Sequence, residues 1–333
     1  MLLRRGPVAR DGILCRSICA SIKPERSMTY RTPLTLSGPL RAPRQMLAEQ
    51  EYGGHASIHD DAKAAELGFV AGPIEGPTHF SQFVPLLARI WGADWFERGC
   101  FSAHFLNMVV EGEEVRAFVD WPEDGATRTR AWAEKADGTP VLEASATLGD
   151  APTLLDERMA ALRAPGPLVI LGDLRVGMTL PPQPVRMAAD QHMGPLYPFS
   201  LTEKLAKITE GSDWHVGASP WGGPIIPLEM VSVLAEYTGH DAGFPVRGPV
   251  VGLYADLEVR MMRGPLMVGH PYQVRREVVA LAESRRTESY WVRTRIFNET
   301  GTTQIAETLL NHATLKQSLT GYDEKRALLE ETP

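Results

Sequence analysis

The order of apolar and polar positions along the chain predicts the same unit twice. Apolar residues recur at intervals of three and four after Pro77 and again after Pro227, which indicates two helices that each have one broad apolar face. Proline suits the first turn of a helix, and Gly92 and Gly239 stand where the two patterns end. The apolar positions are Phe80, Phe83, Val84, Leu87, Ile90 and Trp91 in the first helix, and Leu228, Val231, Leu234 and Ala235 in the second.

Short runs rich in β-branched and aromatic residues follow each helix and predict strands. The expected strands are 101–110, 114–121, 129–134 and 141–148 after the first helix, and 250–262, 272–280, 289–298 and 304–315 after the second. Gly138 and Gly301 each lie in a turn between the last two runs of a set, as in a hairpin. We therefore expect an α+β fold in tandem, in which each half is a central helix wrapped by an antiparallel sheet. Two unrelated α+β domains are the alternative.

These patterns also divide the chain. We expect a basic, Pro-rich extension over 1–44 that is disordered in part, a first unit over 45–150, a connector over 151–198, a second unit over 199–318 and a tail over 319–333. The basic leader resembles either an organellar transit peptide or an extension upstream of a start at Met28, and the second interpretation is favoured.

Composition and charge narrow the class of protein. No apolar run approaches the roughly 18 residues of a membrane helix. The net charge is −7, made of +4 in residues 1–27 and −11 in the rest, which argues against a nucleic-acid partner. Three cysteines, Cys15, Cys19 and Cys100, match neither a disulfide framework nor a zinc site. We expect a cytoplasmic protein, with import by the leader left open.

The candidate chemistry lies just before the first helix. The run from Ile58 holds His59, Ala65, Gly68-Phe69, Ile74 and Gly76 in the order of a known signature, with a displacement of one residue before Gly68. It resembles the MaoC-like (R-specific) enoyl-CoA hydratases, which have the hotdog fold. The tandem layout is similar to double-hotdog members over about residues 45–315.

The resemblance implies a hydratase or dehydratase that acts on an acyl thioester of coenzyme A or a similar carrier, in a homo-oligomer. His59 would be the acid/base, and backbone N–H groups near Gly76 and Thr78, where Pro77 opens the helix, would hold the thioester oxygen. The nearby wall of the pocket would comprise Phe69, Ile74 and Phe80.

The sequence departs from this family at one position. Gly54 stands where the family has the aspartate of its catalytic pair. Asp60 and Asp61 are the nearest replacements, although an aspartate here also suits the N-cap of a short helix. Two alternatives therefore stay open: an acyl-CoA thioesterase, or an acyl-binding protein without catalysis.

The second half offers further polar and aromatic residues. Asp213 and His215 precede the second helix and form either a second site or hydrogen bonds within a loop. Trp214 and Trp221, in a loop rich in Gly, Pro and Ser, are expected to line a pocket or an interface. The pair Arg275-Arg276 belongs to a solvated strand edge or meets the phosphates of coenzyme A.

Other motifs are missing. His55 and His59 lack the glutamate that a zinc-protease helix requires, so no metal is predicted. The chain has neither a nucleotide-binding glycine loop nor the serine elbow of hydrolases, so no cofactor is predicted.

Overall fold

A ten-stranded antiparallel sheet runs through the protein. The computed structural model describes residues 34–52, 55–240 and 243–331, and from Leu34 onward they belong to one compact unit. The strand order is β1-β5-β6-β7-β4-β9-β12-β11-β10-β8. The strands are β1 (Thr35–Ser37), β4 (Gly99–Phe105), β5 (Val115–Asp120), β6 (Arg128–Lys135), β7 (Pro140–Leu148), β8 (Gln183–Arg186), β9 (Gly252–Met261), β10 (Pro271–Glu283), β11 (Thr287–Asn298) and β12 (Gln304–Leu315).

The two halves of this sheet have the same topology. The order β5-β6-β7-β4 in the first half is repeated as β10-β11-β12-β9 in the second, and β4 pairs with β9 at the junction. Both predicted hairpins are present, and their glycines have positive φ angles, +86° at Gly138 and +70° at Gly301. The predicted tandem of two hotdog units is confirmed.

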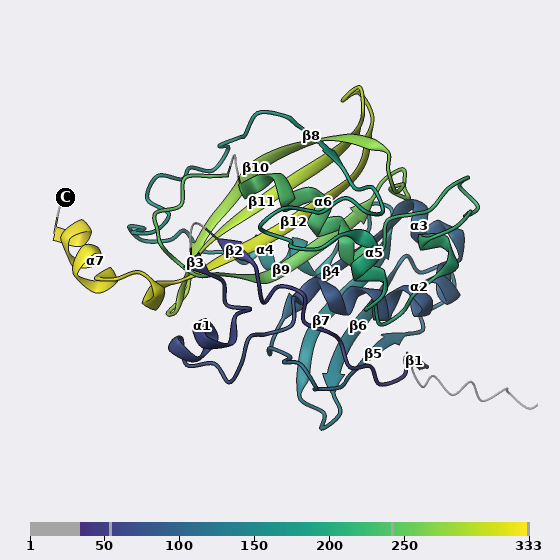
Figure 1. Ribbon diagram of the computed structural model, residues 1–333, viewed down its shortest axis with the longest axis horizontal. Coiled ribbons are helices and arrows are strands. Elements are labelled where there is room, and N and C mark those ends of the chain that lie inside the picture. Colours follow the sequence, from purple (N-terminus) through teal and green to yellow (C-terminus); the bar gives the residue numbers. More distant parts are fainter. Residues whose placement is uncertain (1–33, 53–54, 241–242, 332–333) are drawn as a thin grey trace, which may run out of the picture. The chain divides into compact units, whose positions relative to one another are not determined.

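Each half wraps its sheet around one central helical segment. The first is η1 (Gly76–Phe83) followed by α2 (Val84–Trp91), which ends at Gly92 with φ +59°. The second is η3 (Leu228–Met230), α6 (Val231–Glu236) and η4 (Tyr237–His240). Both segments open with 3₁₀ turns where the sequence predicted plain α-helix. Figure 1 shows α2 against the strands of the first half and α6 against those of the second.

The core is continuous between the halves. Phe80, Phe83 and Leu87 from the first segment share one buried cluster with Met230 and Leu234 from the second. Since η1 and η3 pack against each other, the starts of the two central segments meet inside the protein. Apolar burial on this scale is the main force that holds such halves together.

The stretch predicted as a connector also contributes to the sheet, because β8 pairs with the edge of β10. The predicted tail contains a helix, α7. The remaining elements are β2 (Glu51–Tyr52), β3 (His55–Ala56), α1 (Asp61–Glu66), α3 (Ala93–Arg98), α4 (Leu154–Ala160), α5 (Leu201–Leu205), η2 (Asp213–His215), η5 (Lys316–Ser318) and α7 (Tyr322–Glu331).

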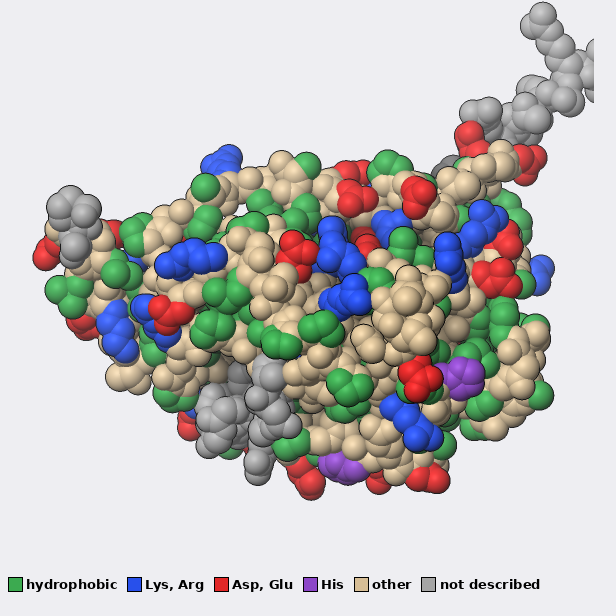
Figure 2. Space-filling view, turned by 90° about the horizontal axis from the view of Figure 1, so that it is seen from above, with side chains coloured by type: hydrophobic (Ala, Val, Ile, Leu, Met, Phe, Trp, Pro, Cys, Tyr) green, Lys and Arg blue, Asp and Glu red, His purple; other side chains and the backbone are tan. Residues whose placement is uncertain are grey.

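Several sequence-based expectations fall on residues outside the described ranges, namely the basic leader with Cys15 and Cys19, and Gly54. Within the described part, none of the helices has the length and apolarity needed to cross a bilayer. The face in Figure 2 carries Lys and Arg interspersed with Asp and Glu, so this face has no extended field of one sign.

Candidate active site

One large cavity lies between the two halves. Its volume is about 900 Å³, within the range of small-molecule sites. The first half contributes residues around the start of η1, and the second half contributes residues of β9, β11 and β12. The polar and charged residues that carry the argument below are His59, Glu75, His79, His104, Arg158, Tyr197, Glu236, Tyr254, Asp256, Arg276, Tyr290, Asn311 and His312.

His59 lies on the wall of this cavity in a fixed orientation. Its Nδ1 is 2.7 Å from the carbonyl oxygen of Pro73, and its backbone N–H donates to Ser57 Oγ at 3.1 Å. A carbonyl oxygen only accepts, so Nδ1 carries the proton and Nε2 keeps its lone pair. Burial lowers the pKa of His59 to about 4, with a smaller contribution from the positive charge of Lys204. The imidazole is therefore neutral at pH 7 and able to accept a proton.

The start of the central segment is adjacent to His59. The N–H of Ile74 donates to the Val109 carbonyl at 2.6 Å, which holds the segment that leads into η1. A side chain at Gly76 would meet the Phe105 ring, since a Cβ there would lie 2.7 Å from Phe105 Cζ. Glycine thus lets the chain approach this ring closely where Gly76 lines the cavity.

Glu75, immediately before Gly76, is a buried carboxyl on the cavity wall. It is 6 % exposed, and its Oε1 has no hydrogen-bond partner within the described ranges. Burial raises the pKa of Glu75, and the nearby Lys204 opposes that rise. A carboxyl of this kind keeps its proton to a higher pH than an exposed one.

Lys204 links Glu75 to the second central segment. Its Nζ lies 3.7 Å from Glu75 Oε2 and 3.3 Å from Glu229 Oε1, and it donates to Thr78 Oγ1 at 2.9 Å. Burial also raises the pKa of Glu229. One ammonium between two buried carboxyls balances only one negative charge, so this arrangement favours a proton on one of them.

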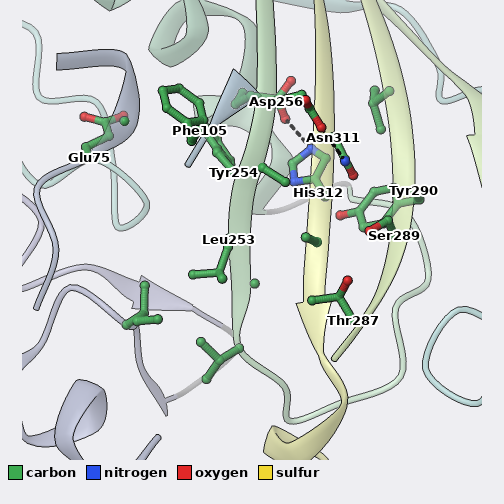
Figure 3. Close-up of a pocket in the computed structure, with 18 of the residues that line it drawn as sticks. Glu75, Phe105, Leu253, Tyr254, Asp256, Thr287, Ser289, Tyr290, Asn311 and His312 are labelled. Atoms are coloured by element: carbon green, nitrogen blue, oxygen red, sulfur yellow. Dashed lines mark hydrogen bonds and ion pairs between the residues drawn. The ribbon is translucent and has the colours of Figure 1, made fainter. Parts of the chain in front are cut away.

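The second half contributes a polar centre across the cavity. His312 is stacked on Tyr290, with ring centroids 4.6 Å apart, and meets Tyr254 edge-on at 5.5 Å. The Tyr254 hydroxyl is 2.7 Å from that of Tyr197. Glu236 lies with Oε2 3.8 Å from His312 Nε2. In Figure 3, Tyr254 lies between Glu75 on one side and His312 on the other.

A charged network closes the cavity beside this centre. Asp256 is fully buried, and its Oδ1 lies 2.7 Å from both His104 Nδ1 and Arg158 Nε. Asn311 Nδ2 donates to its other oxygen at 2.8 Å. Because His104 comes from the first half and Arg158 from α4, Asp256 connects three parts of the chain. Such a compensated buried charge holds the wall in place.

The three residues predicted to be catalytic do not lie together in the structure. Asp60 is the N-cap of α1, with Oδ1 accepting from the N–H of Lys63 at 2.7 Å. Asp61 Oδ1 accepts from the N–H of Gly72 at 2.8 Å and so closes the loop after α1. Of the three residues predicted to be catalytic, only His59 lines the cavity.

The residues of the first half that were predicted to bind substrate lie partly on the cavity and partly away from it. Ile74 and Gly76 line the cavity. Thr78 bonds Lys204, and Phe80 packs edge-on against Phe101 at 4.7 Å within the core. Pro77 is buried in η1, while Phe69 packs with a small cluster next to Ile58.

The predicted residues of the second half lie elsewhere. Trp214 and Trp221 pack around Phe96 of α3, at centroid distances of 5.2 and 5.4 Å. His215 bonds the carbonyl oxygen of Ile225 through Nδ1 at 3.1 Å, which repeats the contact of His59 with Pro73. His59 and His215 are thus equivalent positions of the two halves, and of the two only His59 lines the cavity.

Sequence reasoning missed most of the polar wall. Glu75 lies between Ile74 and Gly76 of the hydratase-like run. Its charge, at the start of an apolar helix, could have indicated a residue of the site. Glu236, Asp256 and His312 lie in segments of mixed polar and apolar residues, and no local motif marks them. The interpretation of Arg276 as part of a solvated strand edge is wrong, because its side chain is 3 % exposed and donates to the Ala235 carbonyl at 3.0 Å.

The buried histidines predict how stability depends on pH. Burial lowers the pKa of His79 to about 4, whereas an unfolded histidine titrates near 6.5. Between these values the unfolded state binds more protons, so the free energy of unfolding decreases as the pH falls from about 6.5 to about 4. Replacing His79 by leucine should reduce that slope by up to about 1.36 kcal/mol per pH unit.

Urea unfolding at a series of pH values measures this slope. Replacing the exposed His192 by leucine is the matched control and should leave the slope unchanged. Equal slopes for wild type and His79→Leu would contradict the assignment of a neutral, buried imidazole.

Among the described residues, no group of three or more His, Cys, Asp or Glu side chains is arranged to hold a metal ion.

Comparison with known proteins shows the fold, through structure alone. No protein-family profile matches the chain, and no curated protein matches it by sequence. Solved structures do match over most of the chain, and double-hotdog and MaoC-like proteins are among them. The protein thus has the double-hotdog fold, and the expected structural resemblance to MaoC-like proteins is confirmed.

Two solved structures illustrate this likeness. One is a MaoC domain protein of Chloroflexus aurantiacus J-10-fl, provisionally described as a dehydratase, with a TM-score of 0.51 and 13 % identity over 86 % of this chain and 95 % of that one. The other is a conserved hypothetical protein of Mycobacterium tuberculosis with a double hotdog fold, with a TM-score of 0.52 and 9 % identity over 85 % and 96 % of the two chains. At these identities the likeness shows the fold and not the reaction.

Proposed function

We propose that the protein is a hydro-lyase that adds water to, or removes it from, an acyl thioester bound in the cavity between its halves. The observation that carries this proposal is the shared cavity wall formed by His59, Glu75 and Gly76. It brings together a base, a buried carboxyl whose pKa is raised and a helix start, which are the parts that hydration of an activated double bond requires.

His59 and Glu75 each carry out one of the two proton transfers. In the hydration direction, Nε2 of His59 removes a proton from water, and the water oxygen bonds to C3 of the enoyl group. Glu75 delivers its proton to C2, and the proton held by His59 then restores the Glu75 carboxyl. Water has been added across the double bond, and both side chains return to their starting states. Dehydration is the same sequence in reverse.

Glu75 takes the part that Asp60 and Asp61 were predicted to take. Both aspartates accept backbone N–H bonds and do not line the cavity, whereas Glu75 lines it and has one carboxyl oxygen without a partner among the described residues. Polarisation of the thioester carbonyl falls to the backbone at the start of η1, next to Gly76.

A direct assay tests the reaction class. We expect purified protein to remove the conjugated enoyl absorbance of short trans-2-enoyl-CoA substrates without releasing free thiol, as judged by a thiol-trapping reagent. Release of coenzyme A would instead favour the thioesterase alternative. Binding of acyl-CoA with turnover of neither kind would favour the acyl-binding alternative. Either result overturns the proposal.

A further inference from the structure

The wall of the cavity opposite Glu75 is polar in a way that the proposed proton transfers do not use. We call the group formed by Glu236, Tyr254, Tyr290 and His312 the distal centre. Figure 3 shows three of these residues, Tyr254, Tyr290 and His312, projecting from the strands of the second half. An unbranched alkyl chain in this space would offer no hydrogen-bond partner to the buried Nε2 of His312, which has none among the described residues.

The His312 ring is fixed but its outer nitrogen is not satisfied. Stacking on Tyr290 at an interplanar angle of 8° and edge contact with Tyr254 at 88° hold the plane of the ring. Nε2 has no hydrogen-bond partner in the described part of the chain, and Glu236 Oε2, at 3.8 Å, is beyond hydrogen-bond distance. Buried polar atoms in native proteins are nearly always paired, so this gap indicates a missing partner.

The neighbouring Asn311 has a similar deficit. Its Nδ2 bonds Asp256, but Oδ1 is buried without a partner within the described residues. Both Asn311 and His312 line the same cavity. Because these two adjacent residues of β12 both have unpaired polar atoms, we expect a ligand with hydrogen-bonding atoms to occupy this end of the cavity.

The fold itself does not require polar residues here. An approximate two-fold symmetry relates the two halves at the β4–β9 pairing, where Cys100 lies opposite Arg260 and Asp256 lies opposite His104. Cys100 and Asp256 are therefore equivalent positions of the two halves. In the first half Cys100 pairs with Thr147, and in the second Asp256 pairs with Asn311. The residue after Thr147 is Leu148, whereas the residue after Asn311 is His312. The polar wall thus belongs to one half only.

The charges nearby decide what kind of group fits. Arg276 donates to the Ala235 carbonyl and to Thr238 Oγ1, and Arg158 is paired with Asp256. These two arginines are the Lys or Arg cations that the described wall of the cavity offers. The charge of Arg158 is compensated by Asp256, and the charge of Arg276, whose hydrogen bonds go to neutral oxygens, acts on Glu236 and opposes the rise that burial causes in the pKa of that carboxyl. A carboxylate on the ligand would therefore lie near Glu236 without compensation. A neutral oxygen meets no such repulsion.

We infer that the acyl group of the substrate carries a neutral oxygen, a hydroxyl or keto group beyond C3, which accepts a hydrogen bond from Nε2–H of His312. A hydroxyl can also donate to Glu236 and bridge the 3.8 Å gap. His312 and Glu236 are thus specificity-determining residues for oxygenated acyl chains. The inference rests on the proposed function for its acyl thioester, but not on turnover.

Calorimetric binding of saturated thioesters tests it, because these compounds cannot be hydrated. Hexanoyl-CoA is compared with its 4-, 5- and 6-hydroxy derivatives. We expect at least one hydroxy derivative to bind about tenfold more tightly than hexanoyl-CoA, the effect of one hydrogen bond to an otherwise unpaired buried group. The variant His312→Phe keeps the stacking and should bring this ratio close to one.

Two further variants make the result unambiguous. Glu236→Gln preserves the shape of the centre and should reduce the preference for a hydroxyl even if His312→Phe folds poorly. Thr287→Val removes a hydroxyl from the same wall about 10 Å along the strand from Tyr290, and should leave the ratio unchanged.

The outcomes separate this inference from the proposed function. Equal affinity of wild type for hexanoyl-CoA and all three hydroxy derivatives would overturn the inference, whatever the enzyme turns over. A preference for a hydroxy derivative that persists in both His312→Phe and Glu236→Gln would also overturn it. A preference that these variants abolish, in a protein that hydrates no enoyl thioester, would support the inference and refute the proposed function.

Discussion

Replacing His59 by glutamine is expected to lower kcat for enoyl hydration by about 10²–10⁴-fold, the usual contribution of a general acid or base. Glutamine retains an amide that can bond the Pro73 carbonyl, but it has no lone pair of comparable basicity. The loss should therefore fall on kcat more than on KM. Stopped assays with saturating enoyl thioester, together with urea unfolding to verify the fold, provide the measurement.

The chain contains its own control for this variant. His215 is the equivalent residue of the second half and makes the same ring contact, with Ile225, but it does not line the cavity. His215→Gln should keep kcat within about twofold of wild type, since it removes no group from the reacting centre. Full activity of His59→Gln, or an equal loss in both variants, would refute the assignment of His59.

The pH profile gives an independent signature of His59. Because burial lowers its pKa to about 4, the base is lost only when the pH falls through that value. We expect kcat/KM to have an acid limb near pH 4 in wild type. An acid limb near 6.5 would indicate an exposed histidine instead.

Replacing Lys204 by methionine is expected to lower the free energy of unfolding by about 3–5 kcal/mol at pH 8, the cost of leaving a buried charge without its partner. Glu75 and Glu229 would both lose the ammonium between them. Methionine fills a similar volume, so packing contributes little to the loss. Chemical unfolding monitored by tryptophan fluorescence measures it.

The pH dependence of this loss distinguishes electrostatics from packing. Burial raises the pKa values of Glu75 and Glu229, and loss of Lys204 raises them further, because that ammonium opposes the rise. The folded variant then takes up protons more readily than the unfolded chain as the pH falls. Its deficit in stability should therefore be smaller at pH 5 than at pH 8.

A matched lysine gives the control. Lys207 lies on the next turn and is exposed, so Lys207→Met should change stability by less than about 0.5 kcal/mol. A deficit for Lys204→Met that is the same at both pH values would show that packing, and not charge, is the cause.

Much of the architecture could be read from local patterns. The β-type runs and the two Pro-to-Gly helical segments agree with the observed elements to within a few residues, except that the first run, 101–110, continues five residues beyond the end of β4. The agreement arises because periodicity reports which face of an element is buried. The 3₁₀ openings at Gly76 and Leu228 were not predicted, since the apolar pattern does not distinguish one helical winding from the other over segments this short.

The candidate site was predictable only where it is local in sequence. His59 and Gly76 belong to one short run, and the structure places both on the cavity. Asp60 and Asp61 belong to the same run, but their carboxylates are used for backbone N–H groups. Short polar side chains satisfy nearby backbone groups readily, and proximity in sequence to a histidine does not direct them toward a cavity.

The sequence by itself determined the repeated unit, the positions of the two central segments and the histidine before the first of them, because each depends on interactions between residues a few positions apart. Only the tertiary structure decided which of two equivalent histidines lines a cavity, which carboxyl shares that cavity and what the opposite wall offers. Those properties arise where β4 meets β9 and where Lys204 reaches the start of the first central segment, through contacts between residues more than a hundred positions apart. A local pattern carries no information on such contacts, since they are fixed by how the halves pack.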